Sequence, residues 1–415
     1  MLTRPIKFEN QSGEVLSALL DLPLDGKPMA FALFAHCFTC SKNYRYVRNI
    51  SRALCSRGVA VFRFDFTGLG ESEGEFANTN FSSNVDDLVA AAEFLRSAYA
   101  PPKMLIGHSL GGAAVLQAAA RIPTAAAVVT IAAPSDPGSL AHRLRRVSGE
   151  IERAGEAEVE LAGRSFTIKK QLLEDLESTR MRETIRTLGR ALLVCHSPAD
   201  EIVGIDNARE IFRNAGHPKS FLSLDRADHL LSDEADSLYV GDVVAAWARK
   251  YVGPVPRASE SEDRSEVVVR TAREKYRSSI AAGRHSLTAD EPDAEGGRDA
   301  GPTPYQYLLS ALGACTSITL KMYADNEKWP LDEIVVRLAH GRVHAADCRE
   351  CDTGEGRVDR ITREIELTGG LDEDRRTRLL EVADRCPVYR ALHSEVIVDT
   401  PECHPAQPAT IARTL

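Results

Sequence analysis

A serine flanked by glycines carries the strongest chemical signal in the sequence. Ser109 is the centre of the run Gly107-His108-Ser109-Leu110-Gly111, which separates an apolar run at 104–106 from a helical pattern at 110–120. A serine on such a tight strand-to-helix turn has a strained backbone, and glycine neighbours avoid the clashes that side chains would cause there. Its hydroxyl projects from the sheet, and the first helical N–H groups point at a developing oxyanion. The motif therefore predicts a nucleophilic serine for acyl transfer.

A serine hydroxyl needs a base, and the base needs an acid that orients it. Asp200 follows an apolar run at 192–195, and His229 follows another at 220–224. Both would lie at the carboxyl ends of strands, where an α/β sheet collects its site. We therefore predict Ser109, Asp200 and His229 as catalytic residues. Other residues remain open for these roles: Asp206, Asp225 and Asp228 as the acid, and His196 and His108 as the base.

The elements that must position these residues alternate between strand and helix patterns. Short apolar runs occur at 30–35, 59–64, 104–106, 125–131, 192–195 and 220–224, with amphipathic helical segments between them at 46–57, 85–99 and 235–251. This alternation indicates a mostly parallel, doubly wound sheet with helices on both faces, and residues 14–22 look like an antiparallel edge. Residues 134–190 are mostly charged and helical, with a hairpin expected at 159–168. An insertion of this size predicts a small cap over the site.

Residues 10–252 resemble the α/β-hydrolase superfamily. The resemblance rests on the serine motif, on His36-Cys37-Phe38 and on the loop-like run Asp65–Gly74. It implies an oxyanion hole formed by the Leu110 and Phe38 N–H groups, although Cys37 stands where members commonly have glycine. The implied reaction forms an acyl-enzyme that water then releases. Ester hydrolysis is the commonest outcome in this superfamily, and thioester, lactone or amide cleavage stays open.

The sequence changes character after residue 252. Residues 253–265 are rich in Gly, Pro, Ser and charged side chains without apolar periodicity, which is typical of a linker. Helical stretches at 305–326 and 373–385 then alternate with strand-like runs at 279–289, 334–338, 361–367 and 396–398. The predicted domains are therefore a hydrolase domain at 1–252, an α+β domain at 266–400 and a tail at 401–415.

This second domain resembles the OsmC/Ohr family of thiol peroxidases. The resemblance rests on Gly301–Tyr305, on Leu308–Thr316 and on Arg385-Cys386-Pro387-Val388. It implies that Cys315 attacks an organic hydroperoxide and that Cys386 resolves the sulfenic acid as a disulfide. It also implies an intertwined homodimer. Family peroxidases carry a glutamate where this chain has Tyr305-Gln306-Tyr307, so a nearby cation, such as Arg284 or Arg298, would have to stabilise the thiolate.

A second group of cysteines could bind a metal. His340, His344, Cys348 and Cys351 supply the ligand types that zinc prefers. Structural zinc sites usually draw their ligand pairs from separated segments, whereas this group is compressed. A plain loop or a second redox pair explains the pattern as well, so we predict no metal and no cofactor.

Composition excludes several other classes of protein. The formal net charge of −9 argues against a nucleic-acid surface and against binding to anionic membranes. The most apolar stretch, at 111–134, is interrupted by Arg121 and Pro123. Nine cysteines, an odd number, are atypical of a secreted disulfide scaffold, which favours a cytoplasmic protein.

The sequence as a whole predicts a carboxylesterase-type serine hydrolase fused to an OsmC-like domain, which would act on a small-molecule ester and form a homodimer through the C-terminal domain. One alternative is an organic hydroperoxide reductase that uses Cys315 and Cys386, with the hydrolase half accessory. In another, the OsmC-like domain serves only for dimerisation.

Overall fold

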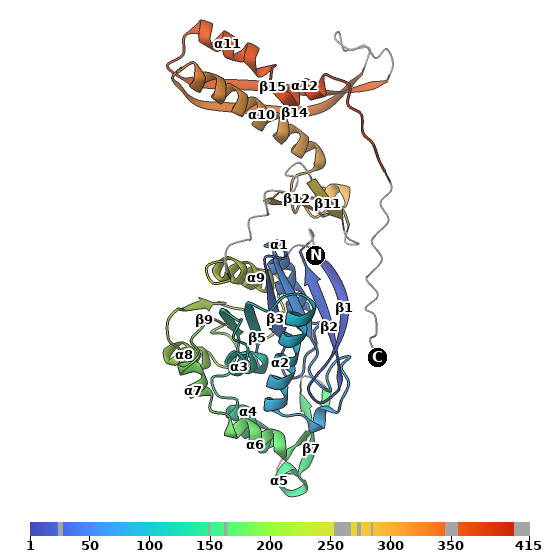
Figure 1. Ribbon diagram of the computed structural model, residues 1–415, viewed down its shortest axis with the longest axis vertical. Helices are drawn as coiled ribbons and strands as arrows, with labels where there is room; N and C mark the ends of the chain where they lie inside the picture. Colours follow the sequence, from blue (N-terminus) through green and yellow to red (C-terminus); the bar gives the residue numbers. More distant parts are fainter. Residues whose placement is uncertain are drawn as a thin grey trace. The chain divides into compact units, whose positions relative to one another are not determined.

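The fold is that of a computed structural model (Figure 1). The structure describes residues 1–23, 28–147, 150–161, 164–252, 267–271, 275–283, 285–344 and 356–401. The chain divides into two compact units, one at 1–272 with 279–287 and one at 273–278 with 288–415. The predicted linker at 253–265 and nearly all of the predicted tail lie outside the described residues, so the predicted domain boundaries remain predictions.

An eight-stranded sheet forms the centre of the N-terminal unit, in the order β1-β2-β4-β3-β5-β6-β9-β10. Its strands are β1 (Leu2–Glu9), β2 (Val15–Leu22), β3 (Ala30–Ala35), β4 (Val59–Phe64), β5 (Met104–His108), β6 (Ala127–Ile131), β9 (Ala191–His196) and β10 (Lys219–Ser223). β1 and β2 form an antiparallel edge, and the six strands from β4 to β10 are parallel to one another. The predicted mostly parallel α/β sheet is confirmed.

Helices cover both faces of this sheet (Figure 1). α1 (Arg45–Ser56) and α9 (Glu234–Ala248) share one apolar cluster, whereas α2 (Phe81–Ala98), α3 (Leu110–Ala118) and α8 (Asp206–Asn214) belong to the cluster on the other face. Every residue of β3, β4, β5, β6 and β9 is buried. Two-sided burial explains why these strands read as continuous apolar runs. No helix among the described residues is long and apolar enough to cross a membrane.

The segment 134–190 forms an insertion between β6 and β9. It contains α4 (Gly138–Val147), α5 (Glu150–Ala154), the antiparallel hairpin of β7 (Glu156–Leu161) and β8 (Arg164–Lys169), α6 (Lys170–Ser178) and α7 (Met181–Arg186). The Asp175 carboxylate accepts hydrogen bonds from the Ser82 N–H and hydroxyl, both at 2.7 Å. Phe166 packs edge-on against Phe76 of the short 3-10 helix η1 (Phe76–Asn78), with ring centroids 5.0 Å apart. These contacts fasten the insertion to the segment 76–82.

The C-terminal unit combines one long helix with a two-stranded ribbon. α10 (Pro304–Asn326) begins at a capping box formed by Thr303 and Gln306, and β14 (Leu331–His344) pairs antiparallel with β15 (Arg357–Gly369). α11 (Glu373–Ala383) and α12 (Pro387–Leu392) follow. The apolar core is small and includes Leu320, Ala324, Leu331, Leu367, Leu371, Leu379, Val382 and Ala383. The α+β prediction is confirmed.

Two strand predictions for the residues after 266 need correction. Residues 279–289, predicted as one strand, form β12 (Ser278–Ala282) and β13 (His285–Ala289), because Gly283 adopts a φ of +55° between them. β12 is the central strand of a three-stranded sheet, between β11 (Val267–Thr271) and β13, and the 3-10 helix η2 (Asp293–Glu295) follows. Val396, Ile397 and Val398, predicted as a strand, belong to no helix or strand and are 64%, 80% and 80% exposed. Among the described residues, no neighbouring strand pairs with them.

Candidate active site

The tight turn between β5 and α3 carries Ser109. This residue has φ 53° and ψ −125°, a left-handed conformation that side chains rarely adopt. A Cβ on Gly107 would collide with the Gly111 carbonyl, and a Cβ on Gly111 would collide with the carbonyls of Ala35 and His36. The flanking glycines are therefore required by close backbone approaches. The second of these approaches also brings the loop after β3 against the start of α3.

Ser109, His229 and Asp200 form a continuous hydrogen-bonded chain. His229 Nε2 lies 3.1 Å from Ser109 Oγ, and His229 Nδ1 lies 2.8 Å from Asp200 Oδ2. Asp200 follows β9, and His229 lies between β10 and α9. All three residues therefore follow carboxyl ends of parallel strands. The arrangement matches the spacing that a nucleophile, a base and an orienting acid require.

The second oxygen of Asp200 is fixed by the main chain. Asp200 Oδ1 accepts hydrogen bonds from the Ile202 and Val203 N–H groups, both at 2.9 Å. Burial opposes the charge on this carboxylate, but the hydrogen bonds from His229, Val203 and Ile202 outweigh burial and hold the pKa of Asp200 below its ordinary value. Asp200 is therefore ionised at neutral pH and favours the His229 tautomer that carries a proton on Nδ1.

The alternative acids and bases have other partners. Asp206 is exposed and pairs with Arg209, whereas the Asp228 carboxylate accepts the Ser232 N–H and the Asp225 carboxylate accepts the Ser223 hydroxyl. His108 and His196 are buried and contact backbone carbonyls through their Nε2 atoms, at 2.7 Å each. None of these five residues is hydrogen-bonded to the Ser109 hydroxyl, whose partner is His229.

The loop after β3 supplies the second predicted oxyanion donor. Phe38 lies in this loop, and Leu110 is the first residue of α3, where the N–H has no carbonyl one turn earlier to bind. Because the loop adjoins the start of α3, the Phe38 and Leu110 N–H groups belong to neighbouring segments. Cys37 and Cys40 form a disulfide that brackets Phe38.

A buried ion pair holds the far end of the same loop. Lys42 Nζ lies 2.6 Å from Asp65 Oδ2, and the Lys42 N–H donates to Asp65 Oδ1 at 2.6 Å. Both side chains are at most 1% exposed. Glu71 also accepts a hydrogen bond from Lys42 Nζ, at 2.7 Å, and this contact holds the pKa of Glu71 below its ordinary value. Lys42 could not be singled out in the sequence, because nothing in the neighbouring residues distinguishes it from a surface lysine.

In the C-terminal unit, the two predicted redox cysteines come together. Cys386 Sγ accepts the Tyr389 N–H at 3.3 Å, lies 3.7 Å from the Thr316 hydroxyl and is hydrogen-bonded to Cys315. Burial would raise the pKa of the Cys386 thiol, but these hydrogen bonds outweigh burial and hold the pKa below its ordinary value. Cys315 is partly exposed, and Cys386 is buried.

Arg363 of β15 lies near this thiol pair, with its guanidinium paired to the Asp384 carboxylate. Arg363 Nη1 donates to the Thr316 hydroxyl at 3.3 Å, and its guanidinium lies 4.8 Å from the centre of the Tyr389 ring. Arg298, one of the two predicted cations, donates its backbone N–H to Asp290. Arg284, the other, lies outside the described residues. Arg363 could not be singled out in the sequence, because it is one of several arginines on an alternating strand.

The compressed histidine and cysteine group is only partly described. His340 Nε2 lies 2.9 Å from Asp359 Oδ1, and the His340 ring stacks on Tyr305 at 4.1 Å. Cys348 and Cys351 lie outside the described residues. Across the part of the chain that the structure describes, no three His, Cys, Asp or Glu side chains are grouped as a metal site.

Comparison with protein families and solved structures agrees with a division of the chain into a hydrolase part and an OsmC-like part. Residues 27–151 match the family model of the serine aminopeptidases S33, and residues 296–400 match that of the OsmC-like proteins. The esterase domain of a Rhodothermus marinus protein is 53% identical, with a TM-score of 0.51. That likeness covers 61% of this chain and 100% of the other. No curated protein gives a significant match.

More distant structures share the fold alone. Est1E from Butyrivibrio proteoclasticus, solved with ferulic acid, is 17% identical over 60% of this chain and 99% of its own, with a TM-score of 0.52. A mouse protein, alpha/beta hydrolase domain-containing protein 10, is 20% identical over 60% of this chain and 99% of its own, with a TM-score of 0.50. The chain belongs to the α/β-hydrolase family, with an esterase-type domain followed by an OsmC-like domain.

Proposed function

We propose that the N-terminal domain hydrolyses carboxylic esters through Ser109, His229 and Asp200. The observation that carries the proposal is the hydrogen-bonded chain from Asp200 through His229 to Ser109, at 2.8 and 3.1 Å. The 53% identity with an esterase domain supports the same class of reaction. Acyl transfer to a serine is the chemistry that this order of groups performs.

The reaction divides into two steps. His229 Nε2 accepts the Ser109 proton as Oγ attacks the ester carbonyl, and the Leu110 and Phe38 N–H groups stabilise the oxyanion. The alcohol leaves with the proton from His229, and an acyl-enzyme remains. Water, activated by the same histidine, then releases the carboxylic acid. Asp200 keeps the imidazole oriented and stabilises its positive charge in both steps.

Replacement of Ser109 by alanine tests this proposal. Ser109→Ala should lower kcat for p-nitrophenyl acetate and butyrate by at least about a thousandfold, because no covalent intermediate can form. Ser97→Ala, at an exposed serine near the end of α2, is the matched control and should keep full activity. Turnover by Ser109→Ala at the wild-type rate would overturn the triad assignment.

A second candidate activity, reduction of an organic hydroperoxide, is favoured by the contact between Cys315 and Cys386. The Cys315 thiolate would attack the outer peroxide oxygen, which breaks the O–O bond and releases an alcohol after protonation. Cys386 would then displace water from the sulfenic acid and form a disulfide, and an external dithiol would return both thiols. Arg363 donates to the Thr316 hydroxyl, which lies 3.7 Å from Cys386 Sγ.

Consumption of cumene hydroperoxide in the presence of a dithiol tests this second activity. The wild type should consume the peroxide, and Cys315→Ser should lose this activity while it retains ester hydrolysis. If the wild type consumes none, the reductase proposal fails and the domain's role is dimerisation alone.

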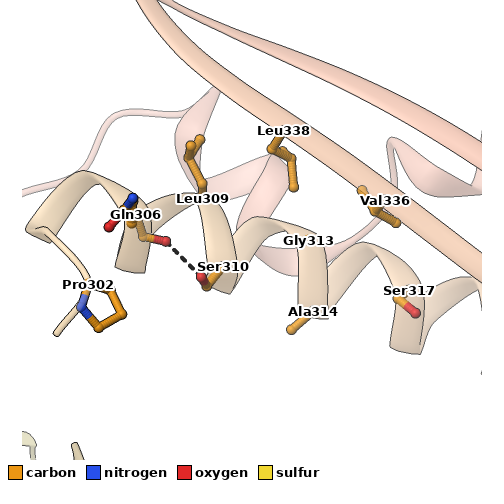
Figure 2. Close-up of a pocket in the computed structure, with 9 residues that line it drawn as sticks. All are labelled: Pro302, Gln306, Leu309, Ser310, Gly313, Ala314, Ser317, Val336 and Leu338. Atoms are coloured by element: carbon orange, nitrogen blue, oxygen red, sulfur yellow. Dashed lines mark hydrogen bonds between the residues drawn. The ribbon is translucent and has the colours of Figure 1, made fainter. Parts of the chain in front are cut away.

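We further propose that the C-terminal domain pairs with a second copy of the chain. Ala314, Ile318 and Met322 follow one another at helical i, i+4 spacing, and Ile318 and Met322 are 59% and 62% exposed. Beside this stripe, α10 and β14 line a groove of about 650 Å³ (Figure 2). Exposed apolar surface of this kind marks an interaction site.

Light scattering after gel filtration tests the proposed dimer. The wild type should have twice the 45.3 kDa mass of one chain, and the double variant Ile318→Asp with Met322→Asp should have the mass of one chain. A monomeric wild type would contradict the proposal.

A further inference from the structure

Three buried histidines surround the proposed triad, and each contacts one main-chain carbonyl. His108 Nε2 lies 2.7 Å from the carbonyl of His229, His196 Nε2 lies 2.7 Å from that of Val203, and His36 Nδ1 lies 2.7 Å from that of Cys37. Each histidine is at most 1% exposed. The three carbonyls belong to the loops that carry the base, the acid and the Phe38 oxyanion donor.

The protonation state of these rings follows from their partners. A carbonyl oxygen only accepts, so the ring nitrogen that faces it must donate. The other ring nitrogen, Nδ1 of His108 and His196 and Nε2 of His36, makes no hydrogen bond among the described residues. Two carboxylates lie nearby, with Asp65 Oδ1 3.7 Å from His36 Nε2 and Asp200 Oδ2 3.6 Å from His196 Nε2. Burial lowers the pKa of all three, to about 3 for His108. Each is therefore a neutral donor at neutral pH.

The contact between His108 and His229 joins two catalytic residues through their own main chains. His108 directly precedes Ser109, and the acceptor is the carbonyl of His229 itself. The loop that carries His229 is strained on both sides, because Asp225 and Leu231 have φ values of 42° and 50° although neither is glycine. A strained loop keeps its conformation only where other contacts hold it. The His108 hydrogen bond is such a contact.

We propose that His108 is a positioning residue that fixes the main chain of His229 relative to Ser109, with His196 and His36 acting in the same way on the acid loop and the oxyanion loop. This inference rests on the proposed triad. The alternative role for His108 is packing alone, since its ring centroid lies 4.5 Å from that of Tyr46 and 5.0 Å from that of His229. The two roles make different demands on residue 108. Packing requires only the volume of the side chain, whereas positioning requires a hydrogen-bond donor at the place of Nε2.

Two substitutions separate these roles. In His108→Gln the side-chain amide nitrogen occupies about the position of Nε2 and can still donate, whereas His108→Leu keeps the bulk and loses the donor. We expect His108→Leu to lower kcat for p-nitrophenyl acetate about ten- to a hundredfold with KM changed less than about twofold, because a displaced base slows catalysis more than substrate binding. His108→Gln should remain within about threefold of the wild type.

The remaining variants distinguish the possible failures. His285→Leu, at an exposed histidine of β13, is the control for the substitution itself. Equal activity of the wild type and Ser109→Ala would show that the triad assignment itself is wrong, which is a different failure from that of the positioning role of His108. If Ser109→Ala is inactive while His108→Leu retains the wild-type kcat, or if the Gln and Leu variants lose kcat equally, the positioning role is overturned. Circular dichroism melting of each variant shows whether a lost kcat reflects unfolding.

Discussion

The two units of this chain differ in how completely the described residues cover their apolar side chains. In the hydrolase unit, every proposed catalytic side chain finds its partner within the described chain, on loops that follow strands buried on both faces. In the OsmC-like unit, the core is small, and Ile318, Met322 and Ile397 stay exposed. A doubly covered sheet buries its apolar side chains on both faces, whereas the two-stranded ribbon and the long helix α10 leave several apolar side chains exposed.

The charged groups of the two units differ in the same way. The hydrolase unit buries whole ion pairs, such as Arg63 with Asp21 and Lys42 with Asp65. The pairs of the OsmC-like unit, such as Arg337 with Glu366, lie at the surface. Removal of one partner of a buried ion pair leaves an unpaired buried charge and strongly destabilises the fold, whereas an exposed ion pair contributes little to stability. Removing one partner of an ion pair should therefore lower the free energy of unfolding more in the hydrolase unit than in the OsmC-like unit.

The largest expected effect is that of Asp200→Asn. An amide would stabilise the wrong tautomer of His229, and kcat for p-nitrophenyl acetate should fall about ten-thousandfold. Asp206→Asn, at the exposed alternative acid, is the matched control and should leave kcat unchanged. Equal losses in both variants would refute the assignment of the acid. The Asp200→Asn variant should not change the proposed peroxide consumption by the OsmC-like unit.

The next effect concerns the stability of the hydrolase unit. Lys42→Met leaves Asp65 buried without its cation, which should lower the free energy of unfolding by about 3–5 kcal/mol. Glu71→Gln is the control, because Glu71 binds the same lysine from an exposed position. Trp329→Phe leaves Trp247 as the one tryptophan, so its fluorescence during urea unfolding reports the hydrolase unit. Equal unfolding midpoints for the two variants would show that the buried pair is not stabilising.

The sequence predicted more of the hydrolase unit than of the OsmC-like unit, for a physical reason. A strand buried on both faces, such as β5, has a continuous apolar sequence. The strained turn at Ser109 requires Gly107 and Gly111, so this feature is also visible in the sequence. The strands of the exposed ribbon have no continuous apolar run, and the apolar run at 396–398 belongs to no strand. A strand needs a neighbour to pair with, and the sequence of one chain does not say where that neighbour comes from.

Three contacts that could not be predicted from the sequence join segments that are distant in the chain. Lys42 meets Asp65, His108 meets the carbonyl of His229, and Arg363 meets Thr316. No spacing rule connects such pairs, because the fold brings them together. The histidine in the motif Gly-His-Ser was visible, but its role depends on a loop more than a hundred residues away.

A third effect is acid sensitivity. The pKa values of His36, His108 and His196 are lowered by burial, to about 3 for His108, so these histidines take up protons in the unfolded chain before they do so in the folded one. Stability should therefore fall as pH drops from about 6.5 toward 3, by up to about 1.4 kcal/mol per pH unit for each. His108→Gln removes one of the three. In the Trp329→Phe background, urea unfolding of this variant should lose less stability than its parent between pH 6.5 and 4.5, and parallel losses would contradict the neutral state of His108.

The smallest expected effect lies in the OsmC-like unit, at the Cys386 thiol. Thr316→Val removes a hydroxyl that lies 3.7 Å from Cys386 Sγ and accepts from Arg363, so the pKa of Cys386 should rise toward its ordinary value. Thiolate absorbance at 240 nm, titrated against pH, measures the change, and the difference from a Cys386→Ser variant isolates this cysteine. Burial raises the pKa of Cys55 and Cys195, so those two thiols stay protonated through the titration. An unchanged titration curve would mean that the Tyr389 N–H and Cys315 suffice to hold the thiolate, and that this site, unlike the triad, does not depend on a charged partner in its own chain.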